Sequence, residues 1–485
     1  MPVLVGPYDG RKARRKRCNA CVKRQIKCHG GVPCAYCQRT SQACVMRSRS
    51  IQPGVVFVGQ SSDEDSSTSV VSAVRRTASA RLPKQIPAQR TACYLPYFFT
   101  QFLPSNTFTA EKFVVNDDLL VMVQESAGLR DAVDAVAALH AKKRGYLTCS
   151  EQMETVNAEA LQTYMRSVHS VQEKISAGSF MHDRSALWTT FLLGLFEVCE
   201  LMHDATGTNW LAHFLHGTST LLRIQRPQTL TYSDAQSIQR RTFFLATRIF
   251  EISRSLIFSS PTFLSSPEWT TALANFWANE GATLWHPKEA LFDILPLIAD
   301  LSMRGLGFCK GAAGISFEER SLRIEELGLE GFQMRASLQE WWFVASAWEN
   351  EFGDCFSPHS NLKKPDKELL TGYIYYHAIS IYLSGTYDYH PHWTPSSAPI
   401  LSQSTIEWHV AEILATSHTL LDLGVAGILL FFPLRVAGAR ATDMQSKTTI
   451  LDLLQAISDR GYAVAEAIRT DLFEVWSSKS NDEEE

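Results

Sequence analysis

The sequence predicts a small cysteine-bound module at the amino terminus, followed by a large all-α domain of packed, mostly antiparallel helices. Two observations lead to this prediction. Six cysteines gather within residues 18–44, and apolar residues recur at three-to-four spacing across most of residues 91–476. Alternating strand patterns are scarce, and a segment of this length is long enough to bury a large core.

The cysteines form a short internal repeat with the spacing C-x2-C-x6-C, five residues, then C-x2-C-x6-C again. They are Cys18, Cys21, Cys28, Cys34, Cys37 and Cys44. Thiolates are good zinc ligands, and six sulfurs satisfy two four-coordinate zinc ions if one sulfur from each half contacts both. The spacing therefore predicts a zinc-stabilised module that holds two zinc ions.

Two other states of these cysteines are possible. Three disulfides would suit a secreted knot, but residues 1–10 lack the apolar core of a signal peptide. The other five cysteines are scattered, which is typical of a reducing compartment. One zinc ion on four sulfurs would leave two cysteines unused. We expect the pair of zinc ions, which uses all six.

The charge of the chain is strongly asymmetric. The first 50 residues hold 12 Lys and Arg against one acidic residue, Asp9. Because the whole chain has 46 basic and 50 acidic residues, the rest carries 34 and 49, so a module of about +11 precedes a body of about −15. A compact positive module attracts phosphates by counterion release, whereas DNA repels an acidic body. The sequence thus predicts double-stranded DNA as a partner of the module.

The candidate DNA contacts lie before and within the cysteine repeat. A basic run at 11–17 could touch phosphates, act as a nuclear import signal or form a solubilising tail. The segment VKRQIK lies between the second and third cysteines. The DNA-binding candidates are Arg14, Arg15, Lys16, Arg17, Lys23, Arg24, Gln25 and Lys27. We expect Arg39, Arg47 and Arg49 to add phosphate contacts or to extend into the linker.

Residues 45–90 have the composition of a disordered linker. Polar and small residues dominate, with an acidic patch at 61–67, and little apolar area is available to offset the entropy cost of ordering. No sustained heptad pattern follows the cysteines, so the sequence does not predict a coiled-coil dimer.

Helical periodicity is clearest at 151–176, where apolar residues from Met153 to Ile175 fall on one stripe. Ser150 is placed to cap this helix and Gly178 to end it. Similar stripes predict helices over 184–203, 209–225, 234–258, 316–349, 367–384, 405–422 and 443–469. The most apolar run, Gly424 to Leu434, is far shorter than the ~20 residues of a bilayer span and contains Pro433, so it predicts a buried core helix.

The sequence shows no motif typical of an enzyme, and we predict no catalytic residues and no cofactor besides zinc. His203, His213 and His216 lack a further ligand at a supportive spacing, which favours packing over metal binding. The aromatic turn at 389–393 could line a pocket, but a packed surface loop is favoured.

The carboxyl terminus mixes acidic and large apolar groups. Residues 471–476 precede an acidic tail at 477–485, and such a mixture can act as an activation region. Alternatively, 471–476 ends the last core helix and 477–485 is a frayed tail. The apolar spacing of 471–476 continues that of the preceding helix, which favours the second interpretation.

The segment from Arg15 to Cys44 resembles the DNA-binding domain of the fungal zinc binuclear cluster transcription factors. It shares all six cysteine positions and the proline before the fourth cysteine, Pro33. The resemblance implies that Cys18 and Cys34 bridge the two zinc ions.

The same resemblance implies that VKRQIK forms a short helix whose end enters the major groove, and that the target contains CGG-like triplets. Arg24 and Lys27 match the family's basic pattern, whereas Val22 and Gln25 depart from it. Glutamine is better suited to adenine than to guanine.

The larger region resembles the fungal-specific regulatory domain found downstream of such clusters. The likeness is carried by FLLGLFEVCE at 191–200, NWLAHFLHGTSTLLRIQRP at 209–227, RRTFFLATRIFEISRSL at 240–256 and PLRVAGARA at 433–441. The predicted organisation is a basic arm at 1–17, the zinc cluster at 18–44, the linker at 45–90, an all-α regulatory domain at 91–476 and an acidic tail at 477–485.

Together, the two resemblances imply a nuclear, zinc-dependent, sequence-specific DNA-binding transcription factor that regulates RNA polymerase II transcription, of metabolic or secondary-metabolite genes. Its other partners would be components of the transcriptional machinery, and no membrane partner is expected. The alternative is a zinc knot for protein–protein contacts in a transcriptional co-regulator without direct DNA readout.

Overall fold

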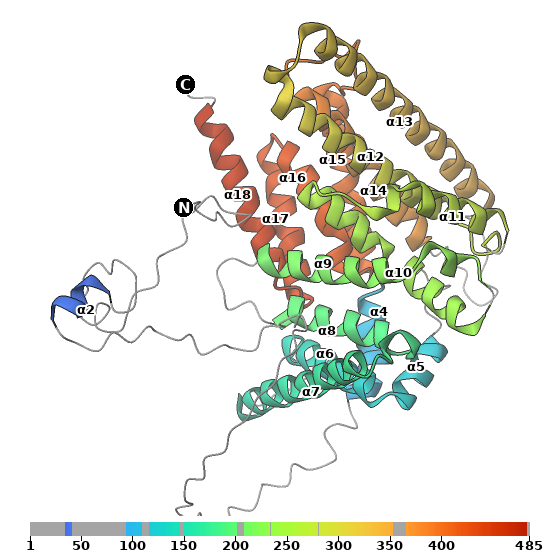
Figure 1. Cartoon of the computed structure of the whole chain (residues 1–485), viewed down its shortest axis with the longest axis vertical. Helices are drawn as coiled ribbons and strands as arrows, with labels where there is room; N and C mark the ends of the chain where they lie inside the picture. Colours follow the sequence, from blue (N-terminus) through green and yellow to red (C-terminus); the bar gives the residue numbers. More distant parts are fainter. Residues whose placement is uncertain are drawn as a thin grey trace, which may run out of the picture. The chain divides into compact units, whose positions relative to one another are not determined.

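The computed structural model of the chain describes residues 34–40, 94–108, 116–145, 150–200, 208–232, 234–279, 281–352 and 365–482 (Figure 1). Its contacts divide the chain into two units, Met1–Lys84 and Gln85–Glu485. The predicted linker at 45–90 lies outside the described residues. The described part of the second unit is helical and contains no strand, which confirms the predicted all-α domain.

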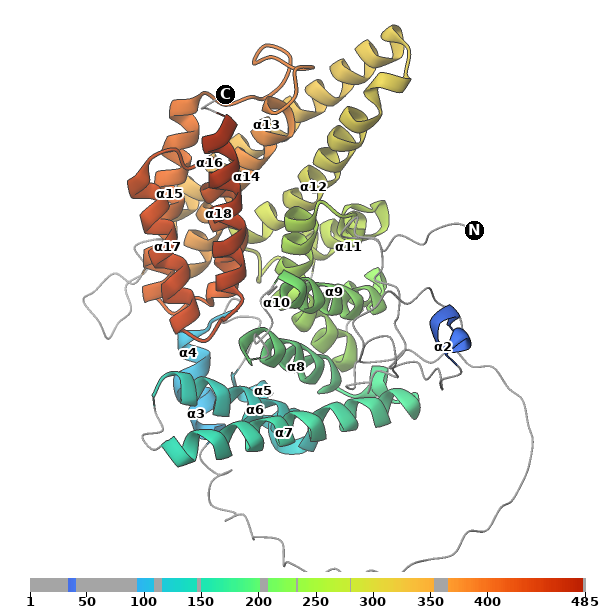
Figure 2. The same cartoon turned by 90° about the vertical axis from the view of Figure 1, so that its left-hand side faces the viewer.

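The second unit begins with a layer of helices that includes two long ones, α6 and α7. The elements of this layer are α3 (Tyr94–Tyr97), a π-helical turn (Phe98–Phe102), α4 (Leu103–Ser105), α5 (Asn116–Glu125), α6 (Ala127–Lys143) and α7 (Ser150–Ser176). The helices α6 and α7 lie side by side (Figures 1 and 2). Their backbones approach closely at Gly128, where a Cβ atom would lie 2.6 Å from the Ser170 hydroxyl oxygen.

Three further helices, α8 (Ala186–Glu200), α9 (Thr208–Ile224) and α10 (Ala235–Phe258), form the middle of the domain. Aromatic side chains join them: the ring of Phe191 on α8 lies 5.7 Å from that of Phe214 on α9 and 5.4 Å from that of Phe250 on α10. The Asp234 carboxylate accepts hydrogen bonds from the backbone N–H groups of Gln236 and Ser237, which fixes the start of α10.

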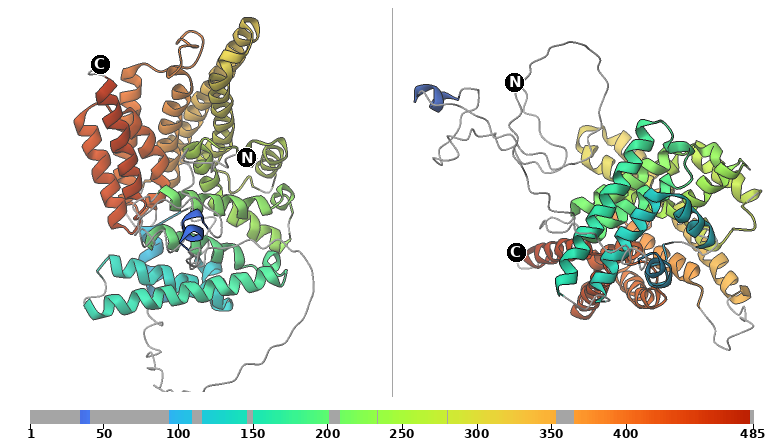
Figure 3. Two further views of the ribbon diagram at one scale, coloured as in Figure 1. Left: turned by 60° about the vertical axis from the view of Figure 1, so that its left-hand side comes forward. Right: turned by 90° about the horizontal axis from the view of Figure 1, so that it is seen from below.

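The second half of the domain contains α11 (Pro267–Ala278), α12 (Pro287–Gly311), α13 (Phe317–Phe352), α14 (Lys367–Asp388), α15 (Gln403–Asp422), α16 (Phe431–Arg440), α17 (Met444–Asp459) and α18 (Ala465–Asp482). Asp366, Ser402 and Asp443 accept hydrogen bonds from backbone N–H groups at the starts of α14, α15 and α17. The helices α15 to α18 gather into a bundle, drawn in orange-red and red in Figure 3. Among the described helices, none combines the length and the apolar character that crossing a bilayer requires.

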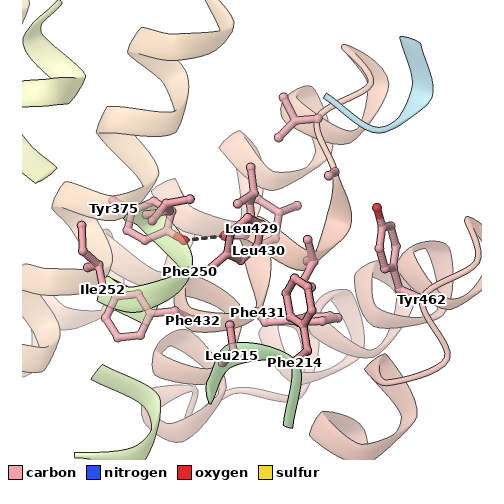
Figure 4. Packing of buried hydrophobic residues seen from close by; sticks show 14 of the residues in the cluster. Phe214, Leu215, Phe250, Ile252, Tyr375, Leu429, Leu430, Phe431, Phe432 and Tyr462 are labelled. Carbon is pink, nitrogen blue, oxygen red and sulfur yellow. Dashed lines mark hydrogen bonds between the residues drawn. The ribbon is translucent and has the colours of Figure 1, made fainter. Parts of the chain in front are cut away.

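The apolar run Gly424 to Leu434 is buried as predicted, but only its last part is α-helical. Gly424 has φ +80°, and a Cβ atom there would lie 2.1 Å from the Pro104 carbonyl oxygen. A short 3-10 helix, Gly427–Leu430, leads into α16, and Pro433 lies in the first turn of α16, where it costs no hydrogen bond. Figure 4 shows this run packed between helices, with the Tyr375 hydroxyl donating to the Leu429 carbonyl at 2.9 Å.

Most predicted helices are present near their expected bounds. For example, α7 starts at Ser150, and Gly178 follows its end with φ +67°. The prediction of a single helix over 443–469 was wrong. The segment forms two helices, α17 and α18, and the turn between them contains Gly461, which has φ +110°. The chain turns there because few residues other than glycine adopt that conformation.

Apolar periodicity in the sequence also failed to predict four helices, which are α5, α6, α11 and α12. In α6 every residue from Leu129 to Ala141 except Arg130 and Asp131 is buried, so only a narrow polar face marks the helix. The last helix, α18, extends to Asp482, beyond the expected start of the tail.

Candidate metal centre and the buried charges of the helical domain

The described part of the first unit is a short helix, α2 (Ala35–Arg39), that carries two of the six predicted metal ligands. Cys34 precedes the helix and Cys37 lies within it, and their exposed fractions are 0% and 1%. The backbone N–H of Gln38 donates to the Cys34 carbonyl at 3.0 Å. This hydrogen bond connects Cys34 to the first turn of α2. Residues three apart share one side of a helix, and both thiols are therefore turned inward on the same side.

The other predicted site residues lie outside the described part of the chain. These are the ligands Cys18, Cys21, Cys28 and Cys44 and the DNA-binding candidates Arg14, Arg15, Lys16, Arg17, Lys23, Arg24, Gln25 and Lys27. Arg39, at the end of α2, is exposed, whereas both cysteines of the helix are buried. Two thiols on the same side of α2 are ligands of the type that zinc takes in proteins.

Two of the side chains singled out in the sequence, His216 and Trp393, have packing contacts in the described residues. His216 is exposed and stacks on Phe258 at 6.1 Å between ring centroids, whereas His203 and the side chain of His213 lie outside the description. In the turn at 389–393, Trp393 is buried and donates from Nε1 to the Ile324 carbonyl at 3.0 Å. Within the described residues, no group of three or more His, Cys, Asp or Glu is arranged to hold a metal ion.

The interior of the helical domain contains a network of charges that the sequence did not predict. Arg248 on α10 has an exposed fraction of 1%. Its guanidinium donates to the carboxylate of Glu289 on α12 at 2.7 Å and also to Asp293 one turn further on. The Trp277 indole N–H donates to the same Asp293 carboxylate at 2.9 Å. The network ties α10, α11 and α12 together.

Lys288 extends this network toward α14. Its ammonium group lies 2.8 Å from Glu289 and 3.3 Å from Glu368 at the start of α14. Burial alone would lower the pKa of Lys288, but the two carboxylates outweigh burial and raise the pKa, so the amine stays charged. Burial would likewise raise the pKa of Glu289, yet Lys288 and Arg248 bring it below its usual range.

A neighbouring contact fixes the starts of α12 and α14 against each other. His286 accepts a hydrogen bond at Nδ1 from the Lys288 backbone N–H at 3.1 Å. Its Nε2 therefore carries the proton and donates to the Asp366 carboxylate at 3.1 Å. The charged side chains in this region thus pair with one another, although the Nε atom of Arg248 has no hydrogen-bond partner, and pairing of this kind is typical of a structural network.

A small cavity of about 40 Å³ borders the network. Its wall includes Lys288 and Glu368 on the polar side and Ile249, Phe292 and Leu429 on the apolar side. That volume has room for a few water molecules. A partial signal for the network was present in the sequence, because Arg248 lies within the largely apolar stretch FFLATRIF of α10. Its pairing with Glu289 was not visible, since it depends on how α10 packs against α12.

The fold defines a large all-helical domain whose internal charges hold helices in place. The sequence matches the Fungal specific transcription factor domain over residues 93–306 and 316–485. The chain therefore belongs to the fungal specific transcription factor domain family, and this membership indicates a regulator of transcription. No curated protein and no solved structure matches the chain.

Proposed function

We propose that the chain is a zinc-dependent, sequence-specific DNA-binding regulator of transcription by RNA polymerase II that acts in the nucleus. The observation that carries the proposal is the spacing of the six cysteines beside a strongly basic run. The burial of Cys34 and Cys37 on one side of α2 supports it, and so does the family of the downstream domain.

In this proposal the six cysteines hold two zinc ions, with Cys18 and Cys34 shared between them. Bound zinc would supply folding energy to a module that is too small to build a hydrophobic core. Lys23, Arg24 and Gln25 would contact base edges in the major groove or the neighbouring phosphates.

The remaining basic side chains would orient the module on the DNA duplex. Arg14, Arg15, Lys16, Arg17 and Lys27 would contact phosphates, which set the register without reading sequence. The helical domain would tune activity or recruit the transcriptional machinery, and the regulated genes would be metabolic or secondary-metabolite genes.

Metal content and DNA affinity of the full-length protein test the proposal together. Native mass spectrometry should find two zinc ions, and fluorescence anisotropy should show duplex binding that chelation abolishes and that weakens steeply with salt. Cys34→Ser should lose both ions, because its sulfur is shared. Cys309→Ser, which changes a half-buried cysteine of α12, is the matched control and should keep metal and affinity.

Arg24→Ala separates base reading from phosphate contact. If Arg24 reads a base, the substitution should weaken binding to the preferred site by about 1–3 kcal/mol and leave random duplexes less affected. Retention of both zinc ions with no DNA affinity at low salt would contradict the proposal. That result would favour the protein-contact zinc knot, which the departures at Val22 and Gln25 allow.

A further inference from the structure

The longest helix of the domain, α13, has two unlike faces. Its inner face is buried against the rest of the domain through Leu327, Leu338, Trp341 and Ala345, each exposed by 4% or less. The opposite face also carries large apolar groups, and these are exposed. Apolar residues on both faces are unusual for a helix at the surface, because a surface helix normally has one polar side.

The exposed apolar residues form a regular stripe. Leu322, Leu329, Ala336 and Phe343 recur every seventh residue, which is close to two helical turns, so they lie in one row. The exposed fractions are 67% for Leu322, 59% for Leu329 and 73% for Phe343. Figure 1 shows α13 at the outside of the domain, beyond α12. We call this row the α13 stripe.

The charges beside the α13 stripe are acidic. Glu318, Glu325 and Glu340 lie within about 60° of the row on a helical wheel, and Glu319 lies at its edge. Among the ion pairs of the described residues, none involves these four carboxylates. The face therefore combines apolar contact area with uncompensated negative charge.

The three arginines of α13 do not neutralise this face. Arg323 pairs with Glu326 at 2.9 Å, and the Arg335 guanidinium lies 4.9 Å from the ring centroid of Phe332. Arg320 reaches toward the Ile315 carbonyl at 3.4 Å. All three project from other sides of the helix, at more than about 100° from the middle of the stripe.

The inner contacts hold the α13 stripe outward. Trp341 donates from Nε1 to the Pro287 carbonyl at 2.7 Å, and the Tyr387 hydroxyl donates to the Leu327 carbonyl at 2.8 Å. A Cβ atom at Gly328 would lie 2.1 Å from the Ser397 carbonyl oxygen. Because the backbone approaches its neighbours this closely, α13 cannot rotate to bury the stripe inside its own domain.

We propose that the α13 stripe is a docking surface for a basic amphipathic helix of a partner protein. The partner would present an apolar residue every seventh position, flanked by lysine or arginine that pairs with the four glutamates. Charge complementarity selects this occupant. A second copy of the stripe would place glutamates against glutamates, and like charges oppose such an interface.

Three labelled peptides probe the surface on the full-length protein. Each spans about three heptads. The first has leucine at every seventh position flanked by lysine, the second replaces the lysines by glutamate, and the third scrambles the first. Fluorescence polarisation should show binding of the lysine peptide that is at least tenfold tighter than that of the other two and that weakens with added salt. Equal binding of all three peptides, or no binding of the first, would overturn the proposal.

Three exposed apolar positions provide a double variant of the stripe and a control variant away from it. Leu329→Gln combined with Phe343→Gln should weaken binding of the lysine peptide at least tenfold. Met444→Gln on α17 is the control, because Met444 has the same exposed fraction as Phe343, 73%. All three substitutions are at the surface, so circular dichroism and the thermal midpoint should stay unchanged. Equal losses from both variants would show that the stripe is not the site.

Two further experiments reverse charges beside the α13 stripe and measure whether the protein associates with itself. Glu325→Lys with Glu340→Lys should shift the preference from the lysine peptide toward the glutamate peptide. Sedimentation velocity on the full-length protein checks the competing occupant. A concentration-dependent dimer that Leu329→Gln and Phe343→Gln abolish would identify a second copy as the occupant and overturn the proposed partner.

Discussion

The Nδ1 atoms of His377 on α14 and His409 on α15 lie 2.8 Å apart, so one imidazole donates a hydrogen bond to the other. Both side chains are buried, and the Trp408 ring lies 5.1 Å from His377 and 4.7 Å from His409. Burial lowers the pKa of His377 to about 3, with His409 contributing, and lowers the pKa of His409 to about 4. The pair therefore belongs to the folded state only while both rings are neutral.

This pair predicts a loss of stability in mild acid. In the unfolded chain a histidine takes up a proton near pH 6.5, whereas in the folded chain these two do not until pH 4 or below. The free energy of unfolding should therefore fall as the pH drops from about 6.5, by up to about 1.4 kcal/mol per pH unit for each histidine. Replacing both by leucine should flatten the change in urea midpoint between pH 7 and pH 5. His418→Leu, an exposed change on the same helix, should leave it as steep as in the unmodified protein.

Asp134 predicts the opposite dependence on pH. It is buried on α6, its Oδ1 atom accepts no hydrogen bond, and burial raises its pKa to about 7, with Asp131 adding to the effect. Between about pH 4 and 7 the Asp134 carboxyl is ionised in the unfolded chain but keeps its proton in the folded chain. The free energy of unfolding therefore falls as the pH rises through this range. Asp134→Asn should raise the urea midpoint at pH 8 and have little effect near pH 4. Asp131→Asn, which removes an ion pair with Arg166, serves as comparison; a gain from both would show that mere loss of charge is responsible.

The buried Arg248 predicts a large cost when its charge is removed. Arg248→Met leaves Glu289 buried without this partner, and we expect a loss of about 3–5 kcal/mol in the free energy of unfolding. Arg304 is the control, because it also pairs with two carboxylates but its side chain is 44% exposed. Arg304→Met should cost less than about 1 kcal/mol. Urea unfolding followed by tryptophan fluorescence measures both, and similar losses would refute the role of burial.

Leu472 and Phe473 are neighbours on α18, and we expect their substitution to change the stability of the protein by different amounts. Leu472 is 1% exposed and packs where a Cβ atom on Gly438 would lie 2.6 Å from its Cδ2 atom, whereas Phe473 is 46% exposed. Leu472→Ala should cost about 2–5 kcal/mol, because it opens a cavity between α16 and α18. Phe473→Ala should change stability by no more than about 0.5 kcal/mol. Thermal unfolding distinguishes them, and equal midpoints would show that α18 is not part of the core.

A second contact with Gly438 bears on the two interpretations of residues 471–476. Trp476 is buried and donates from Nε1 to the Gly438 carbonyl at 2.8 Å, so the segment is part of a core helix. That helix, α18, does not end at Trp476 as expected but continues to Asp482. Deleting 471–485 would remove this contact and Leu472 together. A reporter assay for activation should therefore use Phe473→Ala, which leaves the core intact, rather than the deletion.

Local pattern was sufficient for the fold class and for many helices. The apolar stripe and the glycine after it placed α7, and the same reasoning placed α9, α10 and α15. Periodicity failed to predict helices that are buried on most of their sides, such as α6. It also failed where one glycine interrupts a continuous apolar stripe, as Gly461 does between α17 and α18. Periodicity reports which side of a helix is buried, so it has no signal when every side is buried.

By itself the sequence determined the all-helical class, the cysteine spacing that predicts a zinc module and the charge difference between the two parts of the chain. Only the tertiary structure decided that Arg248 meets Glu289 across 41 residues and that His377 meets His409 across 32. It also decided that the α13 stripe faces outward. The physical reason is that spacing along a chain sets the face of each helix, whereas the partner of that face depends on how helices pack in space.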